Sequence, residues 1–190
     1  MSTSDFATTI PVIIAHEAYR KPDGSWLYWV DDPDDSGGET AWGISMLMIK
    51  AEGITPQEIG LASFTPGCLK NLTMDKAEYL YKKFFWDRYS YGKINDWVCS
   101  TKVCDCGVNC GPGHAGAMAQ RAANMPAALI DGILGDKSFA LINSIDPKKY
   151  VPAMAAEMKK YYTNLVAAKP SLSKFLNNWL QRAEWGVNLV

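Results

Sequence analysis

The run IIAHEAYRKPDGSWLYWVDDPDDSGGETAWGIS at residues 13–45 decides the fold, because its pattern changes twice. Apolar residues at helical spacing predict a helix over about Ile10–Tyr19, with Glu17 near its end. After the turn signal Asp23-Gly24, large side chains alternate at Trp26, Tyr28 and Val30 and predict a short strand or hairpin. An acidic loop with two glycines follows, and a second short strand is expected over Thr40–Ile44. This stretch therefore predicts a helix that leads into a small antiparallel hairpin.

The rest of the chain predicts helices. Cap residues, proline at first-turn positions and glycine or proline breaks mark their ends. The expected helices begin near Thr55, Thr73, Asn95, Pro112, Asp136, Asp146 and Ser171. The predicted fold class is therefore mainly α, or α+β in detail, with no internal repeat.

Composition excludes several classes of protein. The 190 residues are 48% hydrophobic and 21% charged, which excludes global disorder. The net charge of −1 makes a nucleic-acid binder unexpected. No run approaches 18 apolar residues and residues 1–5 lack a signal-peptide pattern, so we expect neither membrane insertion nor a signal peptide. The segment from Asp146 onward has seven basic and three acidic residues, which indicates either solvated helix faces or affinity for an anionic surface.

Glu17 and the loop after it carry the residues suited to glycoside chemistry. Burial and the negative end of a helix dipole both favour a protonated carboxyl at Glu17, as a general acid requires. Ionised aspartates in the loop at residues 31–36 would complement it, because two carboxyl groups cleave most glycosidic bonds. By spacing alone, an acidic solvated turn beside a partly exposed glutamate is the favoured explanation, because acidic loops are common.

Six blocks of this chain together resemble glycoside hydrolase family 108, small lysozyme-like N-acetylmuramidases that include many phage endolysins. The likeness covers roughly residues 8–185 and includes an Asp-x-x-Val-Asn-x-Gly helix and an Asp-Gly-x-x-Gly turn. The blocks are Ile13–Glu17, Asp32–Ser45, Phe85–Tyr89, Val103–Ala115, Asp131–Asp136 and Phe175–Arg182. The resemblance implies a lysozyme-like fold, with a catalytic segment at 8–92 and a peptidoglycan-binding segment at 93–185 packed as one structural unit.

The resemblance also implies catalytic residues. The family's catalytic glutamate falls on Glu17, although Ala18-Tyr19 stand where two glycines usually follow and residues 21–29 look inserted. The assisting aspartate falls on Asp35, with Asp32 second, and Thr40 would help to hold water. The implied reaction is hydrolysis of the β-1,4 bond after N-acetylmuramic acid in peptidoglycan, with no cofactor and no metal. An inverting or a retaining outcome is left open, because it depends on the carboxyl separation.

Aromatic and polar residues supply candidates for substrate binding. Trp26, Trp29 and Trp42 flank the acidic loop and could stack on sugar rings. Asp105 and Asn109 lie one helical turn apart, and the resemblance implies that they shape the groove or brace the hairpin. A hydrogen-bonded pair within the helix is the alternative.

The five cysteines, four of them within residues 99–110, are expected to be reduced and to fill the core. A zinc site at Cys106, Cys110 and His114 is the alternative, although Gly111-Pro112-Gly113 breaks its register.

Two rival functions remain: a non-catalytic peptidoglycan-binding module and a cysteine-rich metal-binding protein. For the enzyme, the expected partner is the peptidoglycan glycan strand. We expect a monomer held in the host cytoplasm until a holin-like partner releases it to the periplasm and cell wall.

Overall fold

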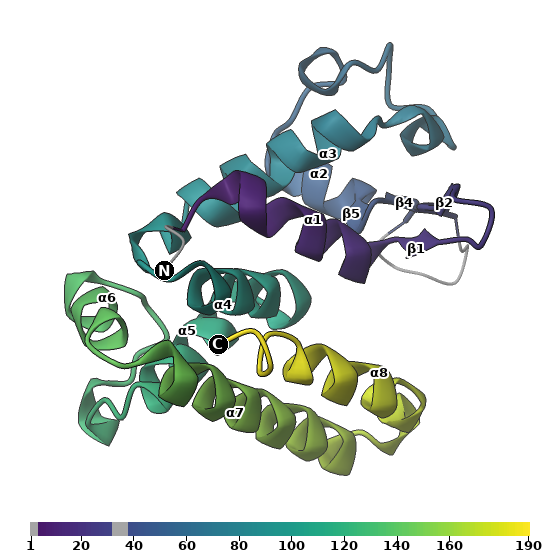
Figure 1. The fold of residues 1–190 in the computed structure, drawn as a ribbon. Coiled ribbons are helices and arrows are strands. Elements are labelled where there is room, and N and C mark those ends of the chain that lie inside the picture. Colours follow the sequence, from purple (N-terminus) through teal and green to yellow (C-terminus); the bar gives the residue numbers. More distant parts are fainter. Residues whose placement is uncertain (1–3, 32–37) are drawn as a thin grey trace. The chain divides into compact units, whose positions relative to one another are not determined.

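The computed structural model describes residues 4–31 and 38–190 and confirms a mainly α fold with small antiparallel sheets (Figure 1). The chain divides into two compact units. We call Ile10–Lys83 the hairpin unit, and the residues up to Thr9 together with Phe84–Val190 the helical unit. Within the described part of the chain, no helix is long and apolar enough to cross a membrane.

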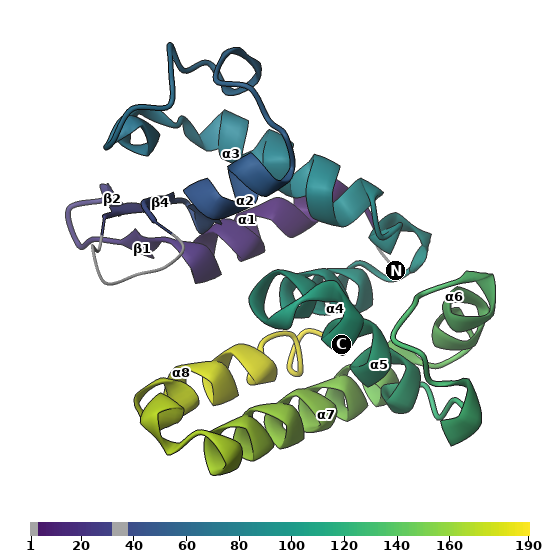
Figure 2. The same ribbon diagram turned by 180° about the vertical axis from the view of Figure 1, so that it is seen from behind.

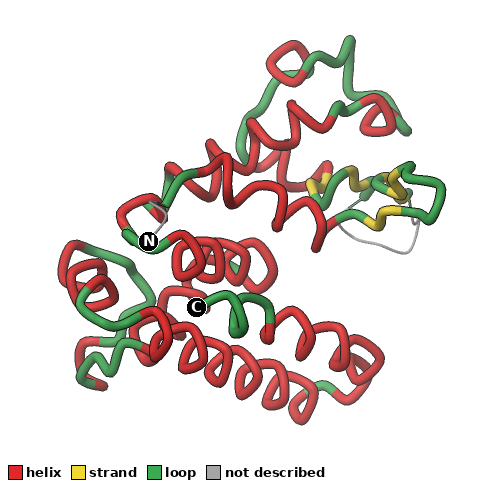
Figure 3. Tube along the Cα trace, in the orientation of Figure 1, coloured by secondary structure: helices red, strands yellow, loops and turns green. Residues whose placement is uncertain are grey.

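The hairpin unit begins within helix α1 and contains all the strands of the described residues, which gather beyond the C-terminal end of α1 (Figure 3). Its elements are α1 (Phe6–Glu17), β1 (Tyr19–Arg20), β2 (Trp26–Leu27), β3 (Trp29–Val30), β4 (Thr40–Ala41), β5 (Ile44–Ser45), α2 (Met46–Ala51), the 3₁₀ turns η1 (Gln57–Ile59) and η2 (Cys68–Asn71), and α3 (Met74–Tyr81).

The strands form two antiparallel sheets, β1–β2 and β3–β4–β5. The expectation of one strand over Thr40–Ile44 is wrong, because the chain reverses within it. Thr40 pairs with Ser45, so Trp42 and Gly43 form a two-residue turn between β4 and β5. Their φ angles of 53° and 79° are the two positive values that a type I′ hairpin turn requires.

A helix was also expected to begin near Thr55, but the structure has only the single turn η1 there. The Thr55 hydroxyl accepts the Glu58 N–H at 3.3 Å, so its cap role is correct. However, Gly60 adopts φ 73° directly after Ile59, and this left-handed residue ends η1 after three residues.

The helical unit is built around a helix that is buried over most of its length. Its elements are η3 (Lys82–Asp87, a π-helical turn that begins in the hairpin unit), η4 (Tyr91–Lys93), α4 (Trp97–Cys110), α5 (Pro112–Ala122), η5 (Ala127–Leu129), α6 (Asp136–Asn143), α7 (Pro147–Ala168), η6 (Pro170–Leu172) and α8 (Ser173–Glu184). Helices α7 and α8 lie side by side in both views (Figures 1 and 2), and α4 packs on α5 and α7.

Helix α4 is the centre of this unit. Asp96 begins it by accepting the backbone N–H groups of Val98 and Cys99, and Gly111 ends it at φ 89°. Every residue from Val98 to Gly107 is buried. Polar side chains on such a buried helix need partners, and those of Lys102 and Asp105 come from α8 and the residue that follows it.

Lys102 is one such buried polar side chain on α4. Its ammonium donates to the carbonyls of Ala183 and Trp185, each at 2.6 Å, at the C-terminal end of α8. A cation there satisfies carbonyls that have no partner within the helix. Burial lowers the pKa of Lys102 to about 8.

Candidate active site

Glu17 is the last residue of α1 and packs against the hairpin turn in the same unit. The position that a Cβ would take on Gly43 is 2.7 Å from Glu17 Oε2 and 2.8 Å from Glu17 Cβ. A side chain at residue 43 would therefore occupy the space of the glutamate. The glycine serves two purposes here, because its φ of 79° also excludes most other residues.

Tyr81, at the end of α3, holds the same turn from another direction. Its hydroxyl donates to the Trp42 carbonyl oxygen at 2.7 Å, and the side chain is 1% exposed. Tyr81 Oη lies 2.4 Å from the same Cβ position on Gly43 that Glu17 Oε2 approaches. The turn therefore packs on both oxygens. The sequence analysis does not single out Tyr81, because the contact spans 39 residues.

The other predicted catalytic residues belong to the same hairpin or to its loop. Thr40 is half-buried and opens β4, three residues before Gly43. Asp32 and Asp35 fall outside the described residues, in the loop between β3 and β4. Because Val30 pairs with Thr40, this loop leaves and re-enters the sheet that carries the Gly43 turn. Asp32 and Asp35 stay predictions as assisting carboxylates.

Glu39 anchors the start of the hairpin from inside. Its buried carboxylate accepts the Leu69 N–H at 3.1 Å, the Trp29 indole N–H at 3.2 Å and the Cys68 thiol at 3.3 Å. Burial, and then the hydrogen bond to Glu39, raise the pKa of the Cys68 thiol. The thiol is therefore a neutral donor that ties the residue before Thr40 to η2.

The three candidate tryptophans have different surroundings. Trp42 is 5% exposed, donates its indole N–H to the Leu72 carbonyl at 2.9 Å and stacks on Tyr28 at 4.3 Å, so its ring is part of the core. Trp29 donates its indole N–H to the Glu39 carboxylate. Trp26 is half-buried, its ring meets Trp42 edge-on at 5.8 Å, and it lines a cavity. Among the three, Trp26 has the setting of a sugar platform.

The cavity beside Trp26 has a volume of about 430 Å³. One face of α1 and the side chains of Arg20 and Trp26 form most of its wall, and α3 closes it with Met74 and Glu78. The Arg20 guanidinium lies 5.8 Å from the Trp26 ring centroid, within cation–π range. An apolar pocket with a few charged groups suits a ligand that has both apolar and polar faces.

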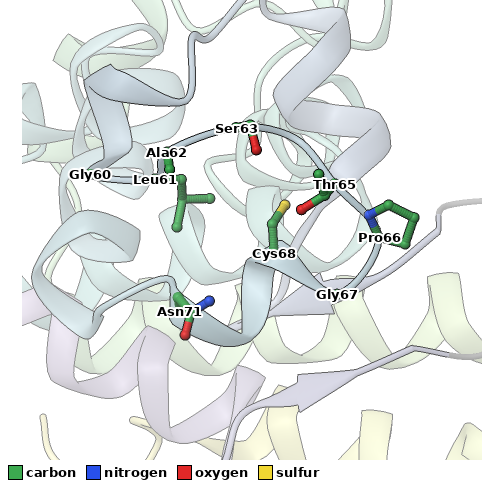
Figure 4. A pocket seen from close by; sticks show the side chains of 9 residues that line it. All are labelled: Gly60, Leu61, Ala62, Ser63, Thr65, Pro66, Gly67, Cys68 and Asn71. Carbon is green, nitrogen blue, oxygen red and sulfur yellow. The ribbon is translucent and has the colours of Figure 1, made fainter.

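A second cavity, of about 310 Å³, lies over the loop at residues 60–71 (Figure 4). The hydroxyls of Ser63 and Thr65 and the Cys68 sulfur point toward its centre (Figure 4). Glu17 lines neither of these two cavities. Cys68, which lines this pocket, donates a hydrogen bond to Glu39, the residue before Thr40.

Asp105 and Asn109 lie in the helical unit, and each side chain bonds to another helix. Asp105 is 2% exposed and accepts a two-pronged ion pair from Arg182, with Nη2–Oδ1 at 2.7 Å and Nε–Oδ2 at 3.0 Å. Asn109 Oδ1 accepts the Tyr162 hydroxyl at 2.8 Å. These bonds tie α4 to α8 and α7. The two predictions, that these residues shape a groove or brace the hairpin, stay open.

The cysteines are free thiols, and Cys68, Cys99, Cys104 and Cys106 are buried. Cys110 Sγ lies 3.5 Å from Cys106 Sγ and donates to the Cys106 carbonyl at 3.0 Å. Burial raises the pKa of Cys99 and Cys104, which keeps them neutral. Over residues 4–31 and 38–190, no three His, Cys, Asp or Glu side chains are grouped to hold a metal ion.

A helix-end glutamate packed on a small antiparallel hairpin, in a mainly α chain, defines a lysozyme-like fold. A solved structure titled "Structure of Brucella abortus SagA" is similar, with a TM-score of 0.69 and 20% identity over 94% of this chain and 89% of that one. No match was found among the curated proteins.

The model of the family described as glycosyl hydrolase 108 matches residues 11–111, and a predicted peptidoglycan domain matches residues 114–184. The chain belongs to glycosyl hydrolase family 108. Family and domain together make it a glycoside hydrolase directed at peptidoglycan.

Proposed function

We propose that this protein is an N-acetylmuramidase that hydrolyses the β-1,4 bond between N-acetylmuramic acid and N-acetylglucosamine, with Glu17 as general acid. The observation that carries the proposal is the packing of the Glu17 carboxyl on the Gly43 turn, 2.7 Å from the position of a missing Cβ. A proton donor must be held in one place to act on one glycosidic oxygen.

Further residues complete the proposed mechanism. Asp35, with Asp32 as the second candidate, stabilises the oxocarbenium-like charge or orients the attacking water. Thr40 helps to hold that water, and Trp26 stacks on a sugar ring beside the Arg20 guanidinium. Asp105 and Asn109 support the substrate-binding surface of the helical unit through α8 and α7. The chain acts as a monomer, and a holin-like partner releases it from the cytoplasm to the cell wall.

The bond that is cut can be identified from the ends that it leaves. Purified peptidoglycan is digested with the protein, and the released fragments are reduced and identified by mass spectrometry. Reducing-end muramic acid is the expected result. Reducing-end glucosamine or new free amino groups would assign a different bond, and binding without release would favour a non-catalytic peptidoglycan-binding module.

The role of Glu17 is tested by Glu17→Gln, which preserves size and hydrogen bonding but removes the transferable proton. We expect a loss of about 10²–10⁴-fold in turnover with an unchanged circular dichroism spectrum. Wild-type turnover in this variant would remove Glu17 from the mechanism.

A further inference from the structure

The cavity of about 430 Å³ beside Trp26 has an apolar floor on one face of α1. We call it the α1 cavity. Its floor is made by Pro11, Ile14, Ala15 and Ala18, which recur at the spacing of one helical face. Three of these four side chains are small, so the floor leaves space above it. Ala18 directly follows Glu17 in the chain, so the cavity begins next to the proposed general acid.

Two opposite charges line the α1 cavity from different elements. Arg20 and Trp26 are paired across β1 and β2, so their side chains share the face of this small sheet that lines the cavity. Glu78 lines it from α3 and is half-buried. Neither the Arg20 guanidinium nor the Glu78 carboxylate forms a hydrogen bond or an ion pair with residues that the structure describes. A ligand that carries both charges could therefore pair with both groups.

The lining of the α1 cavity suits an amino-acid ligand better than a sugar. N-acetylglucosamine has no charge that could pair with Arg20 or Glu78. The short peptides attached to muramic acid in peptidoglycan have alanine methyl groups for an apolar floor and carboxylates for a guanidinium. Where they contain a diamino acid, its free amine can pair with a carboxylate. Trp26 belongs to residues 21–29, which look inserted relative to the family, so this wall is a feature of this chain.

We propose that the α1 cavity binds the peptide stem of the muramic acid whose glycosidic bond is cut, with Arg20 and Glu78 as specificity-determining residues. The sugar ring stacks on Trp26, and its stem occupies the cavity. The proposal rests on the proposed function, because it places that muramic acid at Glu17. It gives the enzyme a preference for glycan that carries stems over glycan that has lost them.

The first test compares two substrates for each variant. Glycan strands are used with their stems and after an amidase has removed the stems, and the release of reducing ends gives kcat/KM for each. Arg20→Gln removes a charge from the cavity. Lys21→Gln is the matched control, because Lys21 is the next residue, is also exposed and does not line the cavity. A partial loss of folding cancels in the ratio of the two kcat/KM values.

A second pair of variants blocks the cavity without changing its charge. Ala15→Leu places a larger side chain on the floor, and Ala7→Leu on the same helix is the control. Both alanines are exposed, but only Ala15 lines the cavity. Thermal melts followed by circular dichroism verify the fold of all four variants.

We expect the wild type and both controls to prefer stem-bearing glycan about tenfold in kcat/KM. Arg20→Gln and Ala15→Leu should reduce this preference to less than about threefold, by lowering kcat/KM on stem-bearing glycan alone. Equal kcat/KM values of the wild type on the two substrates would overturn the proposal. So would an undiminished preference in both Arg20→Gln and Ala15→Leu.

Binding of the free stem peptide separates this proposal from the muramidase proposal. Calorimetry of the full chain with a tetrapeptide stem that contains a diamino acid gives the Kd, which Glu78→Gln should raise about fivefold. Acetylation of the free amine of the peptide should raise it by a similar factor. An absence of binding, or equal affinities of wild type and Glu78→Gln, would contradict the proposed site. Reducing-end muramic acid released with no preference for stems would refute the stem site alone, whereas peptide binding without reducing-end muramic acid would refute the muramidase alone.

Discussion

Replacing Gly43 by alanine tests whether the hairpin turn positions the catalytic carboxyl. The added Cβ would stand 2.7 Å from Glu17 Oε2 and 2.4 Å from Tyr81 Oη. Carbon–oxygen contacts relax to about 3.5 Å, so the glutamate oxygen must move by about 0.8 Å and the tyrosine oxygen by about 1 Å. Because a shift of about 1 Å in an active site can cost about 10²-fold in rate, we expect a loss of that size in turnover.

The control for backbone strain is Gly24→Ala. Gly24 has a φ of 85°, close to the 79° of Gly43, but no atom lies within 4 Å of its Cβ position. Both variants should lose about 1–2 kcal/mol of unfolding free energy from the left-handed conformation. Release of reducing ends from sacculi gives turnover, and urea unfolding gives stability. Equal turnover in the two variants, whether normal or reduced, would refute the positioning role of Gly43.

Three further outcomes are expected. Asp35→Asn should lower turnover on sacculi far more than it lowers binding. Asp34→Asn should do little, because we expect Asp34 to face solvent, where an isolated charge is worth under about 1 kcal/mol. Equal losses in the two variants would mean that the loop contributes only a general negative field. Asp105→Ala should cost about 3–5 kcal/mol in urea unfolding because it leaves the Arg182 cation buried without its carboxylate, and a loss below about 1 kcal/mol would contradict this. Under reducing conditions, the free energy of unfolding should fall above about pH 9 by about 1.4 kcal/mol per pH unit for each buried thiol. The reason is that Cys99 and other buried thiols keep their protons in the folded state and lose them in the unfolded state.

Lys102 opposes this loss of stability at alkaline pH. Its folded pKa of about 8 lies below the unfolded value of about 10.4, so the unfolded state binds more protons between these pH values. That difference raises stability with pH and offsets about one thiol. In Lys102→Met the alkaline loss should therefore be steeper, as measured by urea unfolding at pH 8 and pH 10.

Local signals predicted most of the helix ends, although α1 begins at Phe6 and not near Ile10. Thr73, Asp146-Pro147 and Gly111 stand where α3, α7 and α4 begin or end, because caps and breaks act through neighbouring backbone groups. The position of Glu17 at the end of α1 is likewise confirmed. These features depend on a few adjacent residues, which a sequence displays directly.

Features that depend on distant partners were missed. Tryptophan is not a residue that signals a turn, although Trp42 has a positive φ in the structure. The sequence therefore predicts a continuous strand over Thr40–Ile44 where the chain reverses. The partner of Asp105 lies 77 residues away on α8, and Tyr81 meets the hairpin across 39 residues. Nothing in the local pattern of these residues identifies the partner, because folding brings them together only in the assembled unit.

The burial of α4 limits how this enzyme can be recombined. The match to the hydrolase family ends at residue 111, after α4, yet the structure places α4 within the unit that contains the peptidoglycan domain. A truncation at residue 112 would remove α5 and α7, which pack on the buried α4, together with the carbonyls bound by Lys102 and the guanidinium bound by Asp105. The hydrolase and wall-binding segments therefore cannot be exchanged as cassettes at the boundary that their sequences suggest. A chimera that replaces the binding specificity must carry its own α4, with the junction moved upstream to the start of the helical unit, near Phe84.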